Sequence, residues 1–298
     1  MFKLGIPFLK NCTSFQLINE GFSDDEKWCV DHTYLLRISP HGDLNKLQRQ
    51  AEITNQIHVK DVRIPYVHDV GMYEGKAYMI LDYLSGENGE VALPTKSIEN
   101  QYTIGIQVGE TLKNMHSIPA PHNYPSWEQT WRDRVERLTP RFEEIVSKHP
   151  HYQNVLPFIF DNLHLLENRP SSVQHYDFHP GNILIHKDTF TGLIDMQKIT
   201  YADPINEFYK MEYFNVPISR SYSQGVLDGY HDKQTIPSSF WELHRLYAAI
   251  HIVSAEVWGH EGGIKQLGKF QKYTRFTLIQ FDDFKSLIPK WYSSKVTL

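Results

Sequence analysis

Cysteine is scarce in this sequence, and its scarcity excludes two classes of protein. Only Cys12 and Cys29 occur among 298 residues, which is too few for a disulfide framework or a thiolate metal site. No apolar run approaches the roughly 18 residues that a membrane span requires. The first residues, 1–7, are interrupted by Gly5 and Pro7 too early for a secretory signal. We therefore expect a cytoplasmic protein with two reduced thiols and no membrane association.

The chain also lacks an excess of positive charge. Its formal net charge of -5 argues against a nucleic-acid partner, which usually requires a basic stripe, and suits a cationic small molecule slightly better than an anionic one. No internal repeat or low-complexity tract is visible, and nothing in the sequence indicates an oligomeric state. The 41% hydrophobic residues are enough for one large domain or two modest ones that share a cleft.

The first part of the chain reads as a small lobe rich in β-strands. Short β-type runs, bounded by turn residues, surround one segment with helical spacing of apolar residues. The expected strands are 15–18, 27–30, 34–38, 67–72 and 77–84, and the expected helix is 44–59. These elements predict a compact lobe over residues 1–84. The small, polar and glycine-rich segment 85–89 is the expected linker.

The rest of the chain, residues 85–298, reads as a larger and mainly helical lobe. Helical patterns cover 102–116, 127–148 and 155–167, and further helical segments follow Asp203. Two short β-runs, 183–185 and 192–194, interrupt this region and predict an embedded hairpin. The fold class is therefore α+β, with a small sheet-based lobe, a short linker and a helical lobe, as in enzymes with a cleft.

Residues 174–182 contain the most informative motif. Asp177 lies five residues before Asn182, and His175 lies two residues before Asp177, which is the spacing of the kinase catalytic loop. Asp195 follows a short strand and adds a second carboxylate. We expect Asp177 to accept the proton of the attacking hydroxyl, and Asn182 and Asp195 to bind Mg²⁺ through oxygen atoms. We expect His175 to hold the loop in place.

A second interpretation treats His175, Asp177 and His179 as the metal ligands of a hydrolase. Sixteen histidines make it worth considering. It is weakened because Pro180 and Gly181 break any strand there, and no further cluster supplies the remaining ligands.

The small lobe is expected to bind the nucleotide. A kinase needs a cation on the phosphates, anchored by a carboxylate on a helix. Arg37 occupies the expected strand where a lysine is usual, and arginine can bind phosphate through two N–H groups. Lys27, one strand earlier, is the alternative, and Glu52 is the best partner for either cation. Ser23 is the expected phosphate contact in the turn 21–25, which lacks the glycine-rich pattern of protein kinases.

The end of the last strand of this lobe is the expected site of the nucleotide base. Backbone groups of Asp82 and Leu84 stand where an adenine would pair with the chain.

With these residues in view, the chain resembles the aminoglycoside phosphotransferase family of kinase-like enzymes, from Asn19 to about Met211. The motifs that carry this resemblance are 34–39, 84–87, 116–119, 175–182 and 192–195, together with Asp203-Pro204 and Glu207-Phe208. The resemblance implies a two-lobed protein-kinase-like fold, with a small antiparallel-sheet lobe and a larger helical lobe. It also implies a phosphotransferase with an alcohol group as acceptor, using ATP or GTP with Mg²⁺.

The sequence departs from the family at two places. Tyr176 stands where the family usually has glycine, and Asp195-Met196-Gln197 lacks the glycine of the protein-kinase D-F-G motif. Neither departure removes a catalytic group. A catalytically silent, kinase-like nucleotide-binding module is the alternative, supported by Arg37 and Tyr176.

The acceptor stays open, because this fold also serves macrolide, amino alcohol (choline), homoserine and sugar-amine kinases. A polycationic acceptor would require several carboxylates near Asp177. The acidic candidates in the helical half are Glu207, Asp228, Glu256 and Glu261, and the aromatic candidates for a neutral pocket are Tyr213, Tyr230 and Trp258.

Overall fold

Contacts divide the chain into two units in the computed structural model, which describes residues 5–19, 24–58 and 62–293. The first unit joins Met1–Gly89 to Gly181–Ile199, and the second joins Glu90–Pro180 to Thr200–Leu298. The hairpin that interrupts the helical region thus belongs to the first unit. The lobe boundary that the sequence suggests after residue 84 stays a prediction.

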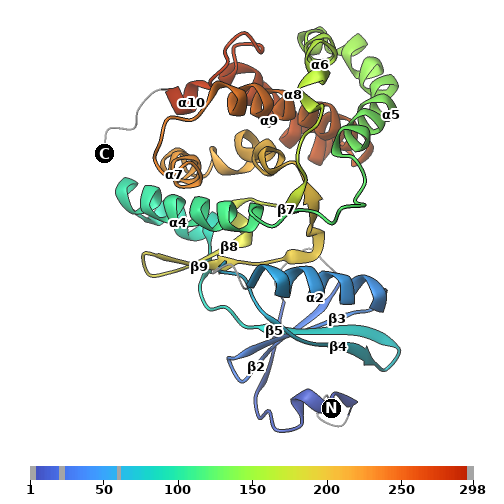
Figure 1. The fold of residues 1–298 in the computed structure, drawn as a ribbon, viewed down its shortest axis with the longest axis vertical. Coiled ribbons are helices and arrows are strands. Elements are labelled where there is room, and N and C mark those ends of the chain that lie inside the picture. Colours follow the sequence, from blue (N-terminus) through green and yellow to red (C-terminus); the bar gives the residue numbers. More distant parts are fainter. Residues whose placement is uncertain (1–4, 20–23, 59–61, 294–298) are drawn as a thin grey trace. The chain divides into compact units, whose positions relative to one another are not determined.

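A five-stranded antiparallel sheet forms most of the first unit (Figure 1). Its strands are β1 (Phe15–Ile18), β2 (Glu26–Val30), β3 (Tyr34–Ser39), β4 (Val67–Tyr73) and β5 (Lys76–Asp82), in the order β1-β2-β3-β5-β4. Helix α2 (Leu44–His58) lies between β3 and β4 in the chain. These elements confirm the predicted α+β lobe of five strands and one helix.

The two faces of this sheet bury different side chains because successive residues of a strand point to opposite sides. Leu36 and Ile38 pack toward the N-terminal segment around Leu9. Leu35 packs on the other face, where Leu47 of α2 joins the core. Arg37 has the same parity as Leu35, so its side chain lies on the face that α2 covers.

A three-stranded sheet completes the first unit. The hairpin of β8 (Ile183–His186) and β9 (Thr189–Leu193) pairs with the short strand β6 (Glu87–Asn88), in the order β6-β8-β9. The predicted linker therefore contains a strand that its polar sequence does not reveal. The 3-10 turn η6 (Met196–Lys198) follows the hairpin.

The second unit is mainly helical. Its longer helices are α4 (Ile98–His116), α5 (Trp127–Lys148), α6 (Val155–Asn162), α7 (Arg220–Tyr230), α8 (Ser238–Glu261) and α9 (Ile264–Gln280), with the short helices α3 (Gly89–Ala92) and α10 (Lys290–Ser293). Strands β7 (Ser172–Gln174) and β10 (Thr200–Ala202) form an antiparallel pair. After β10 come the 3-10 segment η7 (Pro204–Lys210) and the π-helix η8 (Met211–Asn215).

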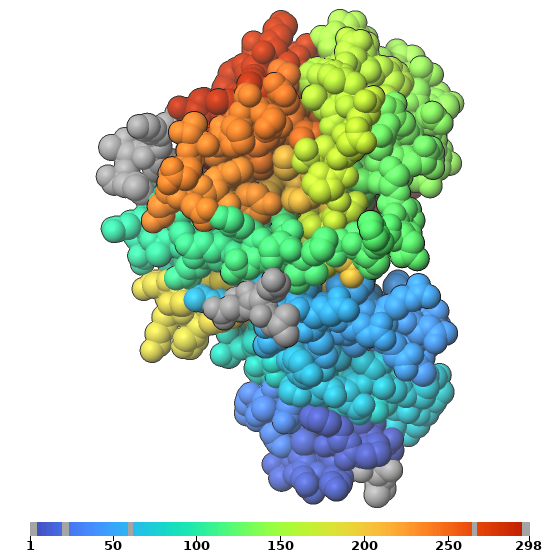
Figure 2. Space-filling model, viewed as in Figure 1, coloured from blue at the N-terminus to red at the C-terminus, as the bar shows by residue number. Residues whose placement is uncertain are grey.

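A core of aromatic and aliphatic side chains holds α5, α6 and α8 together, and includes the fully buried Trp131, Phe142 and Tyr247. In the space-filling view, the orange α9 segment adjoins the yellow-green α6 segment (Figure 2). The helices α4 and α7 pack against each other (Figure 1). Glycines line this contact and let the two backbones approach closely. No helix in the described part of the chain is long and apolar enough to cross a membrane.

Candidate active site

The predicted base, Asp177, lies in the loop that follows β7 in the second unit. Its side chain is 17% exposed, and the Lys210 ammonium lies 2.5 Å from Asp177 Oδ1. His175 is fully buried, and its Nδ1 accepts the backbone N–H of Asp177 at 3.3 Å. The histidine therefore has a position suited to shaping the loop, while the carboxylate keeps an exposed edge.

Glu207 of η7 fixes the backbone of this loop. Its two carboxylate oxygens accept the backbone N–H of His175 at 2.8 Å and of Tyr176 at 2.9 Å. His116 Nε2 lies 3.5 Å from the same carboxylate. A buried carboxylate that accepts two N–H groups is well satisfied. Glu207 is therefore a structural anchor of the loop that carries Asp177.

Asp203 anchors the same region from the start of η7. Its side chain caps this segment by accepting the N–H of Ile205 at 2.9 Å. Arg169 donates two hydrogen bonds to the carboxylate at 2.5 and 3.1 Å, and the hydroxyl of Tyr247 donates a third at 2.9 Å. The pattern Asp203-Pro204 thus ties η7, and with it Glu207, to the helical core.

The predicted metal ligands, Asn182 and Asp195, lie together in the first unit, at one end of the β8–β9 hairpin. Ile183 pairs with Leu193, and the N–H of Ile194 donates to the carbonyl of Asn182 at 2.9 Å. Asp195 is exposed, with a φ of 64°. The hairpin register therefore brings a carboxamide and a carboxylate to the same edge.

This pair fits Mg²⁺ better than a transition metal. Mg²⁺ commonly takes one or two protein oxygens and completes its shell with phosphate oxygens and water. Among the described residues, no group of three histidines, cysteines or carboxylates could hold a metal ion by itself. The alternative with His175, Asp177 and His179 as ligands therefore gains no support.

The two predicted phosphate cations face each other in the first unit. Lys27 of β2 is the direct cross-strand partner of Arg37 in β3, an arrangement that repels unless anions compensate it. Asp25 supplies one such anion, accepting from Arg37 Nη2 at 2.5 Å and from the Ser39 hydroxyl at 2.7 Å. Burial opposes ionisation of Asp25, but the Arg37 and Ser39 hydrogen bonds, with Lys27 nearby, hold its pKa below the usual range.

A polar network links these cations to the segment of Asp195. The side chain of Gln197, two residues after Asp195, donates to Asp25 at 3.3 Å. Gln50 of α2 donates to the backbone carbonyl of Gln197 at 2.5 Å. The strands, α2 and the segment of the predicted ligand Asp195 thus meet through side chains of one unit.

The predicted helix partner, Glu52, is exposed, and Arg37 pairs with Asp25 instead. Among the residues that the structure describes, Glu52 has no ion pair. Ser23, the predicted phosphate contact, lies outside the described residues.

At the strand end predicted to contact the nucleotide base, some backbone N–H groups already donate hydrogen bonds within the first unit. The N–H of Asp82 donates to the Tyr66 carbonyl at 3.0 Å, and its carboxylate lies 2.7 Å from His68 Nε2. The N–H of Tyr83 donates to the Thr33 carbonyl at 2.8 Å. The N–H of Asp82 is therefore unavailable to a base.

Lys210 and Asp25 were not among the predicted site residues, because their placement depends on helix type and strand register. Residues three apart eclipse one another in a 3-10 helix, so Lys210 lies on the face of η7 that carries Glu207. Asp25 has the same strand parity as Lys27, and the pairing of Glu26 with Ile38 brings Asp25 close to Ser39.

Solved structures with the same overall fold include three aminoglycoside phosphotransferases. The ADP-bound APH(2'')-Ib is 14% identical, with a TM-score of 0.62 over 91% of this chain and 95% of its own. A thermostable mutant of APH(4)-Ia with AMP-PNP and hygromycin B is 13% identical, with a TM-score of 0.65 over 92% and 98%. The GDP and kanamycin complex of APH(2'')-IIIa is 13% identical, with a TM-score of 0.67 over 93% and 96%. The comparison with curated proteins gave no match.

The fold is therefore that of these aminoglycoside phosphotransferases. A comparison with protein families matches residues 14–250 to the phosphotransferase enzyme family, which covers most of the chain. The chain belongs to that family, and the resemblance noted in the sequence is confirmed.

Proposed function

We propose that this protein is a small-molecule kinase that transfers the γ-phosphate of ATP or GTP to a substrate hydroxyl, with Asp177 as base. The observation that carries the proposal is the network of the first unit, in which Gln197 and Arg37 both donate to Asp25. This network joins a pair of cations suited to phosphate to the hairpin edge that carries Asn182 and Asp195. Solved neighbours contain ADP, AMP-PNP or GDP, so both nucleotide classes belong in the test.

In the proposed reaction, the γ-phosphoryl group passes from the nucleotide to the acceptor hydroxyl. The acceptor oxygen forms a bond to the γ-phosphorus, the bond from that phosphorus to the bridging oxygen breaks, and the hydroxyl proton passes to Asp177. Mg²⁺, held by Asn182 and Asp195, would neutralise charge on the phosphates. Arg37 and Lys27 bind phosphate oxygens, and His175 with Glu207 holds Asp177 at the angle that the hydroxyl requires.

The test measures the release of nucleoside diphosphate (ADP or GDP) in the presence of a panel of alcohols, for the wild type and for Asp177→Asn. Loss of a general base typically lowers turnover by about 10²–10⁴-fold, with binding of the Mg²⁺–nucleotide retained. Asp161→Asn, on an exposed position of α6, makes the same chemical change away from the loop and is expected to keep full activity. Unchanged turnover in Asp177→Asn would refute the assignment of the base, and absence of Mg²⁺-dependent nucleotide binding would refute the kinase proposal.

A further inference from the structure

Two of the acidic residues that could attract a polycationic acceptor instead accept hydrogen bonds inside the second unit. Glu256 is fully buried, accepts the Thr274 hydroxyl at 2.5 Å and has a pKa that burial raises. Asp228 accepts hydroxyl groups from Tyr102 at 2.7 Å and from Tyr292 at 2.6 Å. Both carboxylates therefore serve the helical core.

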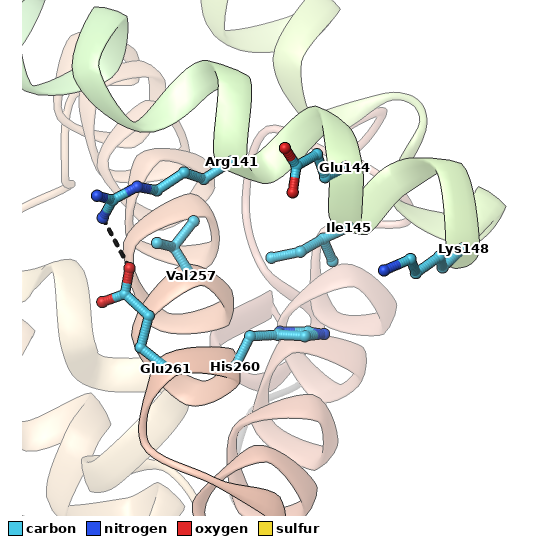
Figure 3. Close-up of a pocket in the computed structure, with 7 residues that line it drawn as sticks. All are labelled: Arg141, Glu144, Ile145, Lys148, Val257, His260 and Glu261. Atoms are coloured by element: carbon cyan, nitrogen blue, oxygen red, sulfur yellow. Dashed lines mark hydrogen bonds and ion pairs between the residues drawn. The ribbon is translucent and has the colours of Figure 1, made fainter.

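The other two acidic candidates are also occupied. Glu261 pairs with Arg141 at 2.7 Å on an exposed surface of α5 and α8, where a surface pocket contains no residue of the catalytic loop (Figure 3). Glu207 is held by the loop backbone. Glu90, 3.6 Å from His179 Nδ1, is a carboxylate on the loop side, and one such group is too few for an acceptor with several amines.

Cations occupy the surroundings of Asp177 instead. The Lys210 ammonium forms an ion pair with the Asp177 carboxylate and lies 5.1 Å from the centre of the Tyr209 ring. Arg134 of α5 lies over the Trp131 ring at 4.8 Å and donates to the Tyr176 hydroxyl at 3.3 Å. Within the described part of the chain, no carboxylate pairs with Arg134. A partly buried guanidinium with most of its N–H groups unused is well suited to an anionic ligand.

His251 of α8 adds neutral hydrogen-bonding groups beside these cations. It is 8% exposed, and its ring lies 4.8 Å from Tyr209 and 4.4 Å from Tyr213. Neither ring nitrogen has a hydrogen-bond partner among the described residues. Burial, together with nearby Lys210 and Arg134, lowers its pKa well below the usual value. Tyr209 also connects the two cations: Lys210 lies over its ring, and the ring of Tyr176, whose hydroxyl accepts from Arg134, lies 6.3 Å from it.

We infer that the acceptor carries a carboxylate or phosphate close to its hydroxyl, and that Arg134 and Lys210 bind this anion beside Asp177. The anion gives Lys210 a second partner, which releases the Asp177 carboxylate to accept the hydroxyl proton. Arg134 can hold either anion through two parallel N–H groups. A polycation would meet two positive side chains at the same place. That the acceptor has a reactive hydroxyl rests on the proposed kinase function. That it carries an anion rests on the contacts of Arg134 and Lys210 in the second unit.

The test measures calorimetric binding to protein saturated with Mg²⁺ and a non-hydrolysable ATP analogue, which occupies the nucleotide phosphate site. The probes are glycerate, glycerol 3-phosphate, neutral glycerol and polycationic kanamycin. At least one of the two anions is expected to bind, more tightly than glycerol or kanamycin. Arg134→Gln and Lys210→Met are each expected to weaken this binding by about tenfold or more, since a charged hydrogen bond is lost. Arg141→Gln, on the same helix, is the matched control and is expected to leave the affinity unchanged.

The outcomes separate this inference from the kinase proposal. Failure of both anions to bind, tighter binding of kanamycin, or anion affinity unchanged in Arg134→Gln would each overturn the anionic acceptor while leaving nucleotide binding intact. Loss of Mg²⁺–nucleotide binding in wild type would instead count against the kinase, and the anion titration can then be repeated without nucleotide. Melting temperatures of all variants establish that the substituted proteins are folded.

Discussion

Tyr176 has a backbone conformation that normally favours glycine. Its φ is 64°, which costs a residue with a Cβ about 1 kcal/mol or more. The bond from its N–H to Glu207 and the contact of its hydroxyl with Arg134 hold it there. These contacts explain in physical terms how the loop accommodates a tyrosine in a conformation that favours glycine.

The strain at Tyr176 can be measured by comparing two truncations. Tyr176→Ala and Tyr176→Gly both remove the ring, but only glycine adopts the left-handed region without steric cost. We expect the glycine variant to exceed the alanine variant in free energy of unfolding by about 1 kcal/mol, measured by urea denaturation. Equal stability, or a more stable alanine variant, would show that the loop does not hold this conformation in solution.

Replacing Glu207 is expected to weaken both the stability and the activity of the protein. In Glu207→Gln one oxygen is replaced by an NH₂ group that faces a backbone N–H, so a buried donor loses its acceptor. We expect a loss of about 1–3 kcal/mol in stability and a lower turnover, because the loop that carries Asp177 loses its anchor. Glu110→Gln, at an exposed position of α4, removes the same charge, and an equal effect there would mean that only charge is involved.

Part of the candidate site could be proposed from the sequence because its spacing is local. His175, Asp177 and Asn182 lie within eight residues, so a motif identifies them without a fold. The partner of Arg37 was not predictable in this way: Asp25 reaches it through the register of β2 and β3. The placement of Lys210 on Asp177 likewise depends on how η7 packs.

At the scale of elements, the contact between α4 and α7 depends on four glycines. They are Gly105 and Gly109 in α4, with Gly225 and Gly229 in α7. A Cβ at Gly109 would lie 2.1 Å from the backbone oxygen of Val226, so the helices cannot keep this distance with a larger residue.

Gly109→Ala is therefore expected to destabilise the protein, although alanine favours helices. The overpacked contact costs typically about 1–3 kcal/mol, which outweighs the gain of about 0.5–1 kcal/mol in helix propensity. Gly268→Ala, in α9 with nothing within 4 Å of the added Cβ, is the matched control and is expected to stabilise. Thermal and urea unfolding of both variants check the opposite signs; a stabilised Gly109→Ala would mean that the helices lie farther apart.

Element prediction succeeded where the hydrophobic pattern was strong. The range 127–148 expected for a helix coincides with α5, and the strand 15–18 coincides with β1. The helix expected to begin at Tyr102 begins at Ile98 instead, because the Ser97 side chain accepts the N–H of Asn100 and caps it. Strand β6 went unpredicted because its two polar residues form a strand only through pairing with β8.

For the molecule as a whole, the buried His251 links stability to pH. Burial lowers the pKa of His251 well below its ordinary value of 6.5, and the cations Lys210 and Arg134 act in the same direction. Tyr209 and Tyr213, which pack on its ring, stay uncharged in this range. Below pH 6.5 the unfolded chain therefore binds a proton that the folded protein excludes, and stability falls as the pH falls.

His251→Leu is expected to remove this part of the pH dependence. A single excluded proton costs up to about 1.4 kcal/mol per pH unit, so wild type should lose up to about 2 kcal/mol more than the variant between pH 7 and pH 5. His122→Leu, at an exposed position, should follow the wild-type profile. Urea titrations at both pH values measure the difference. Parallel profiles for wild type and His251→Leu would mean that His251 accepts a proton in the folded state, and the site beside Lys210 and Arg134 would then carry one more positive charge at low pH.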